Sequence, residues 1–292
     1  MVYARCFGDF FKKVVVADNC ALFVNGVFEN YQTLDGSTLF LGAFFFTIQI
    51  YGDFSGYSDI AIGCARLFGI DLMQNFKYPY FSRDIAEFWR RWHISLTTWF
   101  RDYIYIPLGG SRAGKWKSFR NTLVIFLVSG FWHGANWTFV AWGAYHALLF
   151  LPLLLLGQNR RYRDSVAENS FLPSVKELTQ MGATFLLVLL GWILFRSEDI
   201  SQAAVYLERM FNVSLFSAPQ LVGLGFGQLL LKKCFFFTAL MFIVEWIGRK
   251  QAHGLMIEDL SLPVRYVIYT VLLIIIYGFD ASNPQGFIYF QF

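Results

Sequence analysis

The chain has 292 residues, of which 56% are hydrophobic and only 15% are charged, and its mean hydropathy is +0.46. Soluble domains carry about 25% charged residues, so this composition excludes an ordinary soluble globule and indicates a membrane protein. The net charge of +4 is concentrated between Lys77 and Arg120, where nine basic residues accompany three acidic ones. Such an excess is typical of a cytoplasmic segment near lipid headgroups, and among membrane spans it is not expected to bind nucleic acid.

The four cysteines lie far apart in the sequence, with no CxxC pair and no nearby histidine ligand. We therefore expect neither a disulfide framework nor a zinc site, and we assign no metal-binding residue. The simplest interpretation is four buried, small apolar side chains.

Residues 10–28 are apolar but interrupted by charged side chains, so we expect them at the interface or crossing the membrane against protein. The first clear span covers about residues 39–67 and is unusual in containing Asp53 and Asp59. Carboxylates at that depth are expected to face a cavity or to pair with groups on neighbouring helices. The alternative is a shorter span with Asp59 already at the membrane edge.

Residues 82–102 have apolar side chains along one side of a helix and mostly charged or polar ones along the other. This pattern predicts an amphipathic helix on the membrane surface or beneath the spans, with Ser82 as its N-cap. His93 lies at the edge of the apolar face. The turn signals that begin at Pro107 end the helix.

No Asp, Glu, Lys or Arg occurs between Arg120 and Gly157. This length predicts a helical hairpin over 119–156 that turns at 134–137, with His133 near the end of the first crossing. Further spans are expected at about 179–196, 231–248 and 264–280, whereas 200–230 has no clear pattern. The resulting fold class is an all-α, polytopic transmembrane helical bundle with interfacial amphipathic helices.

The four histidines differ in their surroundings. His133 lies in the most apolar segment, where a desolvated imidazole stays neutral, as a general base requires. His93 is a weaker candidate, because histidines in tryptophan-rich interfacial helices often have no chemical role. His146 is interpreted as hydrogen-bonded between helices, and His253 as a solvated side chain in a polar loop.

Three linked motifs carry a resemblance to a known family. They are Tyr51-Gly-Asp-Phe-Ser-Gly-Tyr-Ser-Asp-Ile60, the segment from Trp92-His93-Ile-Ser-Leu to Pro107-Leu-Gly-Gly110, and Phe131-Trp-His-Gly-Ala135. Together with the closing segment 287–292, they resemble the membrane-bound O-acyltransferase family. Within it, the chain is most similar to the branch that acetylates polysaccharides such as alginate and exports D-alanine to teichoic acids. The likeness covers residues 8–292.

The resemblance implies a ring of transmembrane helices around a central tunnel. It also implies that His133 is catalytic and that His93 is the second functional position. Residues 1–292 would form a single membrane-embedded acyltransferase domain, the C-terminal portion of the full fold, without the family's N-terminal helices. The protein would be a multi-pass protein of the cytoplasmic (inner) membrane, in contact with its lipids.

The activity implied is that of an O-acyltransferase, moving an acetyl group from a cytoplasmic thioester to an exported polysaccharide or an extracytoplasmic acetyltransferase partner. The donor would be acetyl-CoA or an acyl-carrier thioester, with no permanently bound cofactor, and the donor-binding residues are unassigned. The basic helix 82–102 and the run Arg112–Arg120 would attract donor phosphates, or else serve only to fix the topology.

Two other functions remain open. One is a transporter or proton relay that uses Asp53, Asp59 and His133, although no internal repeat supports it. The other is an acyltransferase of the same broad family that acts on lipids.

Overall fold

The structure is a computed structural model that describes residues 2–111, 114–221, 227–281 and 286–288. All regular elements among these residues are helices, which confirms the predicted all-α fold. Some sequence features lie outside the described residues. These are Arg112 and the part of the closing segment 287–292 beyond Ile288.

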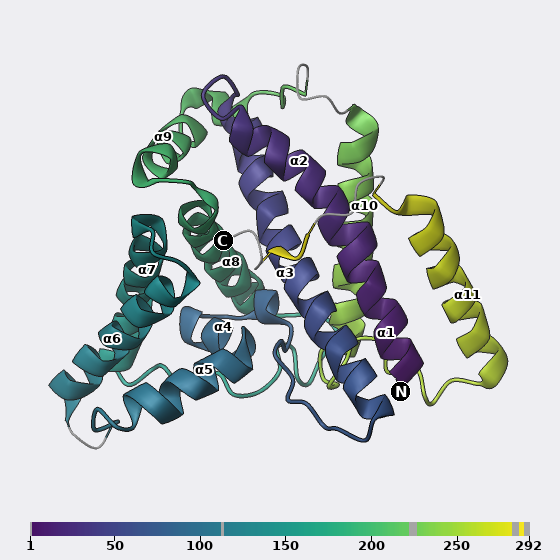
Figure 1. Ribbon diagram of the computed structural model, residues 1–292, viewed down its shortest axis with the longest axis horizontal. Helices are drawn as coiled ribbons and strands as arrows, with labels where there is room; N and C mark the ends of the chain where they lie inside the picture. Colours follow the sequence, from purple (N-terminus) through teal and green to yellow (C-terminus); the bar gives the residue numbers. More distant parts are fainter. Residues whose placement is uncertain (1, 112–113, 222–226, 282–285, 289–292) are drawn as a thin grey trace. The chain divides into compact units, whose positions relative to one another are not determined.

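The chain separates into two compact units, coloured along the sequence in Figure 1. Unit 1 combines Met1–Gln74 with Val205–Phe292, and unit 2 is Asn75–Ala204. The single membrane domain over residues 1–292 stays a prediction.

Unit 1 is built on two long helical segments that lie side by side (Figure 1). The first is continuous through α1 (Val2–Phe10), the π-helical η1 (Phe11–Ala17) and α2 (Asp18–Glu29). The second is α3 (Gly36–Leu67), which begins where the Asp35 carboxylate accepts a hydrogen bond from the Thr38 N–H at 2.9 Å. Such a cap satisfies one of the donors left free at a helix start.

Two glycines one helical turn apart allow these segments to pack closely. A Cβ added to Gly52 would lie 3.1 Å from the Lys12 carbonyl oxygen, and one on Gly56 would lie 2.8 Å from that of Asp9. Small residues at this spacing let two helix backbones approach each other. The contact brings the polar residues of α3 against those of α1 and η1.

The C-terminal part of the chain completes unit 1 with η4 (Val213–Phe216), α10 (Gln228–Gly248) and α11 (Leu262–Phe279). The Gly36 N–H donates to Ser214 Oγ at 2.9 Å, and the Asn19 side chain donates to the Phe279 carbonyl at 3.0 Å. These bonds join segments far apart in sequence. The helix α9 (Ile200–Met210) lies in the stretch that the sequence left unassigned.

Unit 2 contains the predicted helical hairpin, which is confirmed with its turn at Gly134–Asn136. Its elements are η2 (Pro79–Phe81), α4 (Ile85–Arg91), α5 (Ile94–Phe100), η3 (Arg101–Tyr105), α6 (Lys115–His133), α7 (Trp137–Leu155) and α8 (Val175–Arg196). The hairpin is formed by α6 and α7, and α8 packs against α7. Ser174 and Glu177 form a capping box at the start of α8.

The predicted single helix over 82–102 is wrong, because the chain forms two short helices there, α4 and α5. The N-cap is also different. Asp84 caps α4 by accepting from the Glu87 N–H at 2.6 Å, while the Ser82 hydroxyl donates to the Pro79 carbonyl at 2.6 Å. Ser82 is therefore satisfied by the preceding 3-10 turn.

Three of the described helices, α7, α8 and α11, are long and apolar enough to cross a bilayer. The segments 39–67 and 231–248 also form helices, α3 and α10, but these are not among the three. Both α3 and α10 contain charged residues.

The cysteine interpretation is correct for two residues and wrong for two. Cys20 and Cys234 are buried, whereas Cys6 is partly exposed and Cys64 is exposed. All four are free thiols.

The α6–α7 crossing generates the first testable prediction. A Cβ on Gly143 of α7 would collide with the Phe126 carbonyl oxygen of α6. We expect Gly143→Ala to lower the free energy of unfolding by about 1–3 kcal/mol, because the helices must move apart. The measurement is unfolding of the purified protein in mixed micelles.

Gly182 of α8 is the matched control, because an added Cβ there meets no atom within 4 Å. Gly182→Ala should be neutral or raise the unfolding free energy by about 0.5–1 kcal/mol. Equal losses in the two variants would contradict a close crossing of α6 and α7.

Candidate functional site

His93 occupies the break between α4 and α5, in the left-handed backbone region at φ +44° and ψ 55°. The segment before α4 stabilises this break. The Ile94 N–H donates to the Asn75 carbonyl at 3.0 Å, and the Ser95 hydroxyl donates to Asn75 Oδ1 at 2.5 Å. The Lys77 N–H donates to the Arg91 carbonyl at 3.0 Å on the other side of it. These tertiary bonds replace intrahelical ones, so the periodicity of 82–102 could not reveal the break.

His133 is the last residue of α6 and is half-buried among aromatic rings. The centre of its ring lies 5.0 Å from that of Phe195 on α8 and 5.3 Å from that of Trp142 on α7. The imidazole is thus enclosed by the neighbouring helices of its own unit. Gly134 ends α6, and Asn136 caps α7 by accepting from the Thr138 N–H at 3.1 Å.

Trp132 connects the two histidines. Its ring centre lies 5.0 Å from that of His133 and 6.4 Å from that of His93. His93 and Trp132 also line one cavity of about 380 Å³, together with Ser95 and residues of α5. The structure therefore brings the two predicted residues together around one tryptophan, beside an open space.

Burial lowers the pKa of His93 to about 4. The ring is therefore neutral at physiological pH, with one nitrogen able to donate a hydrogen bond and the other able to accept one. Its Nδ1 lies 3.5 Å from Ser95 Oγ. A neutral imidazole beside a cavity can take a proton from a hydroxyl group or donate a hydrogen bond to a carbonyl oxygen.

The environment of His146 is not the one that the sequence predicted. It is fully buried on α7, and neither ring nitrogen has a hydrogen-bond partner among the described residues. Aromatic rings surround it instead, with Trp89 at 5.0 Å and Trp142 at 5.1 Å between ring centres. The interhelical hydrogen bond expected for His146 is therefore not found in the described part of the chain.

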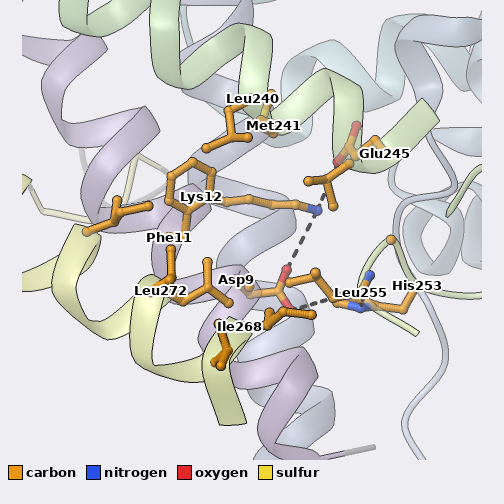
Figure 2. Close-up of a pocket in the computed structure, with 16 residues that line it drawn as sticks. Asp9, Phe11, Lys12, Leu240, Met241, Glu245, His253, Leu255, Ile268 and Leu272 are labelled. Atoms are coloured by element: carbon orange, nitrogen blue, oxygen red, sulfur yellow. Dashed lines mark hydrogen bonds and ion pairs between the residues drawn. The ribbon is translucent and has the colours of Figure 1, made fainter. Parts of the chain in front are cut away.

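Unit 1 contains a separate group of buried charges beside an apolar cavity of about 250 Å³ (Figure 2). The Lys12 ammonium lies 2.9 Å from a Glu245 carboxylate oxygen and 3.6 Å from one of Asp9. The Tyr51 hydroxyl also donates to Glu245, at 2.7 Å. Around these groups, Figure 2 shows apolar side chains of α10 and α11 such as Leu240 and Ile268.

The interpretation of His253 as a solvated side chain is wrong. His253 is only 8% exposed, and its Nε2 lies 3.0 Å from Asp9 Oδ2 (Figure 2). The Leu255 N–H donates to its Nδ1 at 3.2 Å, so the ring proton is on Nε2 and points to Asp9. Burial, with the nearby Lys12 charge, lowers the pKa of His253 to about 4, in agreement with a neutral ring. Asp9 is 244 positions away in sequence, so no local signal indicated this pair.

The expectation that the acids of α3 pair with neighbouring helices is confirmed. Asp59 binds the Arg5 guanidinium, with Nε at 3.0 Å. Asp53 lies 2.6 Å from the Lys13 ammonium and accepts the Ile288 N–H at 2.7 Å. Both carboxylates are buried within the protein, and the alternative of a shorter span with Asp59 at the membrane edge stays a prediction.

Asp9, Asp59 and His253 each offer an atom that could bind a metal ion, all within 4.8 Å of one another. However, Arg5 already binds Asp59, and Lys12 lies against Asp9. These cations supply the positive charge that the carboxylates require. The group is therefore a buried ion-pair cluster.

Comparison with known proteins identifies the family directly. The family model for MBOAT, the membrane-bound O-acyltransferase family, matches residues 24–171, which is half of the chain. This range includes both His93 and His133.

Several bacterial proteins are similar to the chain over half of its length or more. A protein named Probable alginate O-acetylase AlgI, from Pseudomonas aeruginosa, is 41% identical over 232 residues, covering 78% of this chain and 42% of the relative. A peptidoglycan O-acetyltransferase from Helicobacter pylori is 38% identical, covering 70% of the chain and 37% of the relative. A teichoic acid D-alanyltransferase from Streptococcus thermophilus is 36% identical, covering 50% and 35%. The chain therefore spans less than half the length of these relatives.

The ion-pair cluster of unit 1 generates a stability prediction. Lys12→Met would leave the Glu245 and Asp9 carboxylates buried without their cation. We expect the free energy of unfolding to fall by about 3–5 kcal/mol, measured by unfolding in mixed micelles. Lys232→Met, at an exposed position on α10, should change it by no more than about 0.5 kcal/mol. A similar change in both variants would contradict the pairing of Lys12 with these buried carboxylates.

His93 generates a pH prediction. Its pKa is about 4 in the folded protein against an ordinary value of 6.5. Between these values the unfolded chain binds the proton and the folded chain does not, so stability decreases as the pH falls from 6.5 to about 4. His93→Asn removes this contribution while still tolerating the left-handed backbone.

The measurement is the melting temperature of both proteins across this pH range. The advantage of the variant over the wild type should grow as the pH falls. A constant difference from pH 7 to pH 4 would show that the burial of the His93 ring has no such effect.

Proposed function

The chain belongs to the membrane-bound O-acyltransferase family, and we propose that it moves an acetyl group from a cytoplasmic thioester to an exported polysaccharide. The observation that supports this most directly is the His133 imidazole. It is enclosed by the rings of α7 and α8 and adjoins, through Trp132, the cavity that His93 lines.

In the proposed reaction, His133 takes the proton of the acceptor hydroxyl as its oxygen attacks the thioester carbonyl carbon. The new carbon–oxygen bond forms, the carbon–sulfur bond breaks, and the proton passes from His133 to the departing thiolate. General-base catalysis of this kind contributes about 10²–10⁴-fold to the rate. An acyl-His133 intermediate is an alternative route with the same products.

We assign His93 the second role, donating a hydrogen bond to the carbonyl oxygen as negative charge develops on it. Its neutral ring has an N–H to donate, and the hydrogen bonds of Asn75 after the backbone break and of Lys77 before it fix the backbone that carries the ring. A donor held in place before the reaction stabilises an oxyanion more effectively than water does.

The acceptor class follows from the relatives, whose names specify alginate, peptidoglycan and teichoic acid. All three are polymers outside the cytoplasm, which supports an exported polymer, or a partner protein that passes on the acetyl group. We place the protein in the cytoplasmic membrane as a multi-pass protein, with α7, α8 and α11 among its spans.

Two rival functions are weaker. A proton relay would need Asp53 and Asp59 available, but both are bound by basic side chains of unit 1. A lipid-directed acyltransferase would use the same histidines. Incubating membranes with radiolabelled acetyl-CoA, then separating lipid, polymer and protein, distinguishes these functions by the product that carries the label.

The catalytic assignment is tested with His133→Ala in the whole protein, expressed in cells that make the polymer. We expect acetyl ester on the polymer to fall by at least about 100-fold, because the general base is lost. Trp137→Phe is the control, because Trp137 is exposed on the same hairpin. Near-normal acetylation by His133→Ala at normal protein levels would refute the role of His133.

A further inference from the structure

A basic cavity of about 360 Å³ lies on unit 2, apart from the space beside His93. It combines the end of α4 with the loop that follows α7. The basic side chains that line it are Lys77, Arg90, Arg91, Arg160 and Arg163. The fold brings the segment that contains Arg160 and Arg163 against α4.

The two acidic residues of this cavity are already neutralised. Glu87 binds Arg91 at 2.6 Å and Arg83 at 3.0 Å. Asp164 lies 3.1 Å from the same Arg83 guanidinium. Arg83 does not itself line the cavity, so it balances the negative charge of these carboxylates without adding a basic group to the cavity lining.

The remaining basic groups have no carboxylate partner among the described residues. Arg90 donates to two backbone carbonyls, those of Asn159 at 2.5 Å and Tyr162 at 2.6 Å. These bonds fix its position without neutralising its charge. Burial lowers the pKa of Arg90, the Asp84 and Glu87 carboxylates oppose this shift, and the like charges of Arg91 and Arg163 add to it.

Several uncompensated cations at one concave site repel each other unless an anion binds there. Guanidinium groups present paired N–H donors that match phosphate oxygens. Ser165 and Tyr162 also line the cavity, and the Tyr162 hydroxyl accepts a hydrogen bond from Gln180 Nε2 at 2.7 Å. Its chemistry therefore fits a phosphate ester with two or more charged oxygens.

We propose that this cavity binds the phosphate group of the thioester donor, an inference that rests on the proposed acyl transfer. Arg90 and Arg91 end α4, and His93 follows two residues later, so one short segment contributes to both the basic cavity and the space beside His93. Binding the donor by its phosphate would hold the non-reacting end of the molecule while its thioester extends toward the histidines. Binding energy from a remote group can be used in this way to orient the reacting atoms.

The test uses the whole protein in detergent free of phospholipid, titrated calorimetrically with inorganic pyrophosphate and with coenzyme A. The double variant Arg160→Gln/Arg163→Gln removes two cations that are exposed and make no ion pair with described residues. Lys176→Gln, at an exposed position on α8 outside the cavity, is the matched control. Each lost charged contact should weaken binding about tenfold or more, whereas the control should bind like the wild type.

Kinetics provide an independent readout. The double variant should lower kcat/KM for the acyl donor at least about tenfold, whereas Lys176→Gln should leave it unchanged. Unchanged affinity for pyrophosphate and coenzyme A in the double variant would overturn the proposal.

A lipid headgroup is the other source of a phosphate, and vesicles distinguish it. If the double variant loses binding only to vesicles of phosphatidylcholine with phosphatidylglycerol, and keeps its affinity for coenzyme A, the donor assignment is wrong. Pyrophosphate binding needs no turnover and is also measured in His133→Ala. A failure of the acyl-transfer proposal is thereby separated from a failure of this one.

Discussion

The interaction on which unit 1 depends is the pairing of buried charges between helices. Lys12 and Lys13 lie on the π-helical segment η1 and bind carboxylates of α2, α3 and α10, while Arg5 binds Asp59 further along α3. An unpaired charge in such an interior is very costly, so each pair fixes the register of its two helices. The close glycine contact at Gly52 and Gly56 allows these short side-chain distances. Packing and electrostatics therefore specify the same arrangement.

Unit 2 is organised on another principle, the packing of aromatic rings around histidines. His133 and His146 both contact Trp142, and the rings of α7 and α8 surround them. Burial keeps the His93 ring neutral, which is the state that base or hydrogen-bond chemistry needs. Rigid rings also hold an imidazole in one orientation at little entropic cost, because they have few rotatable bonds. The same packing thus provides stability and positions the candidate groups.

The break in the helix between α4 and α5 connects these features to the proposed binding of substrate. Had residues 82–102 formed one helix, His93 would lie at the edge of a regular apolar stripe, and Arg90 and Arg91 would have continued along its polar face. Instead, the hydrogen bonds of Asn75 and Lys77 interrupt the helix. As a result, Arg90 and Arg91 line the basic cavity, and His93 lines the separate cavity beside Trp132. A functional site at an irregular backbone is a common arrangement, because side chains there escape the helical periodicity.

The sequence by itself determined the membrane class, the positions of the long helices and the 134–137 turn, since these depend on local hydropathy and on motifs, and it made His133 the proposed catalytic residue. It also indicated that Asp53 and Asp59 require partners, because an isolated buried carboxylate is unfavourable. Only the tertiary structure decided which partners they have, that Asp9 binds His253, that the helix breaks at His93, and that the arginines near residue 160 join α4. These features depend on contacts between residues far apart in sequence, and local periodicity contains no information about such contacts.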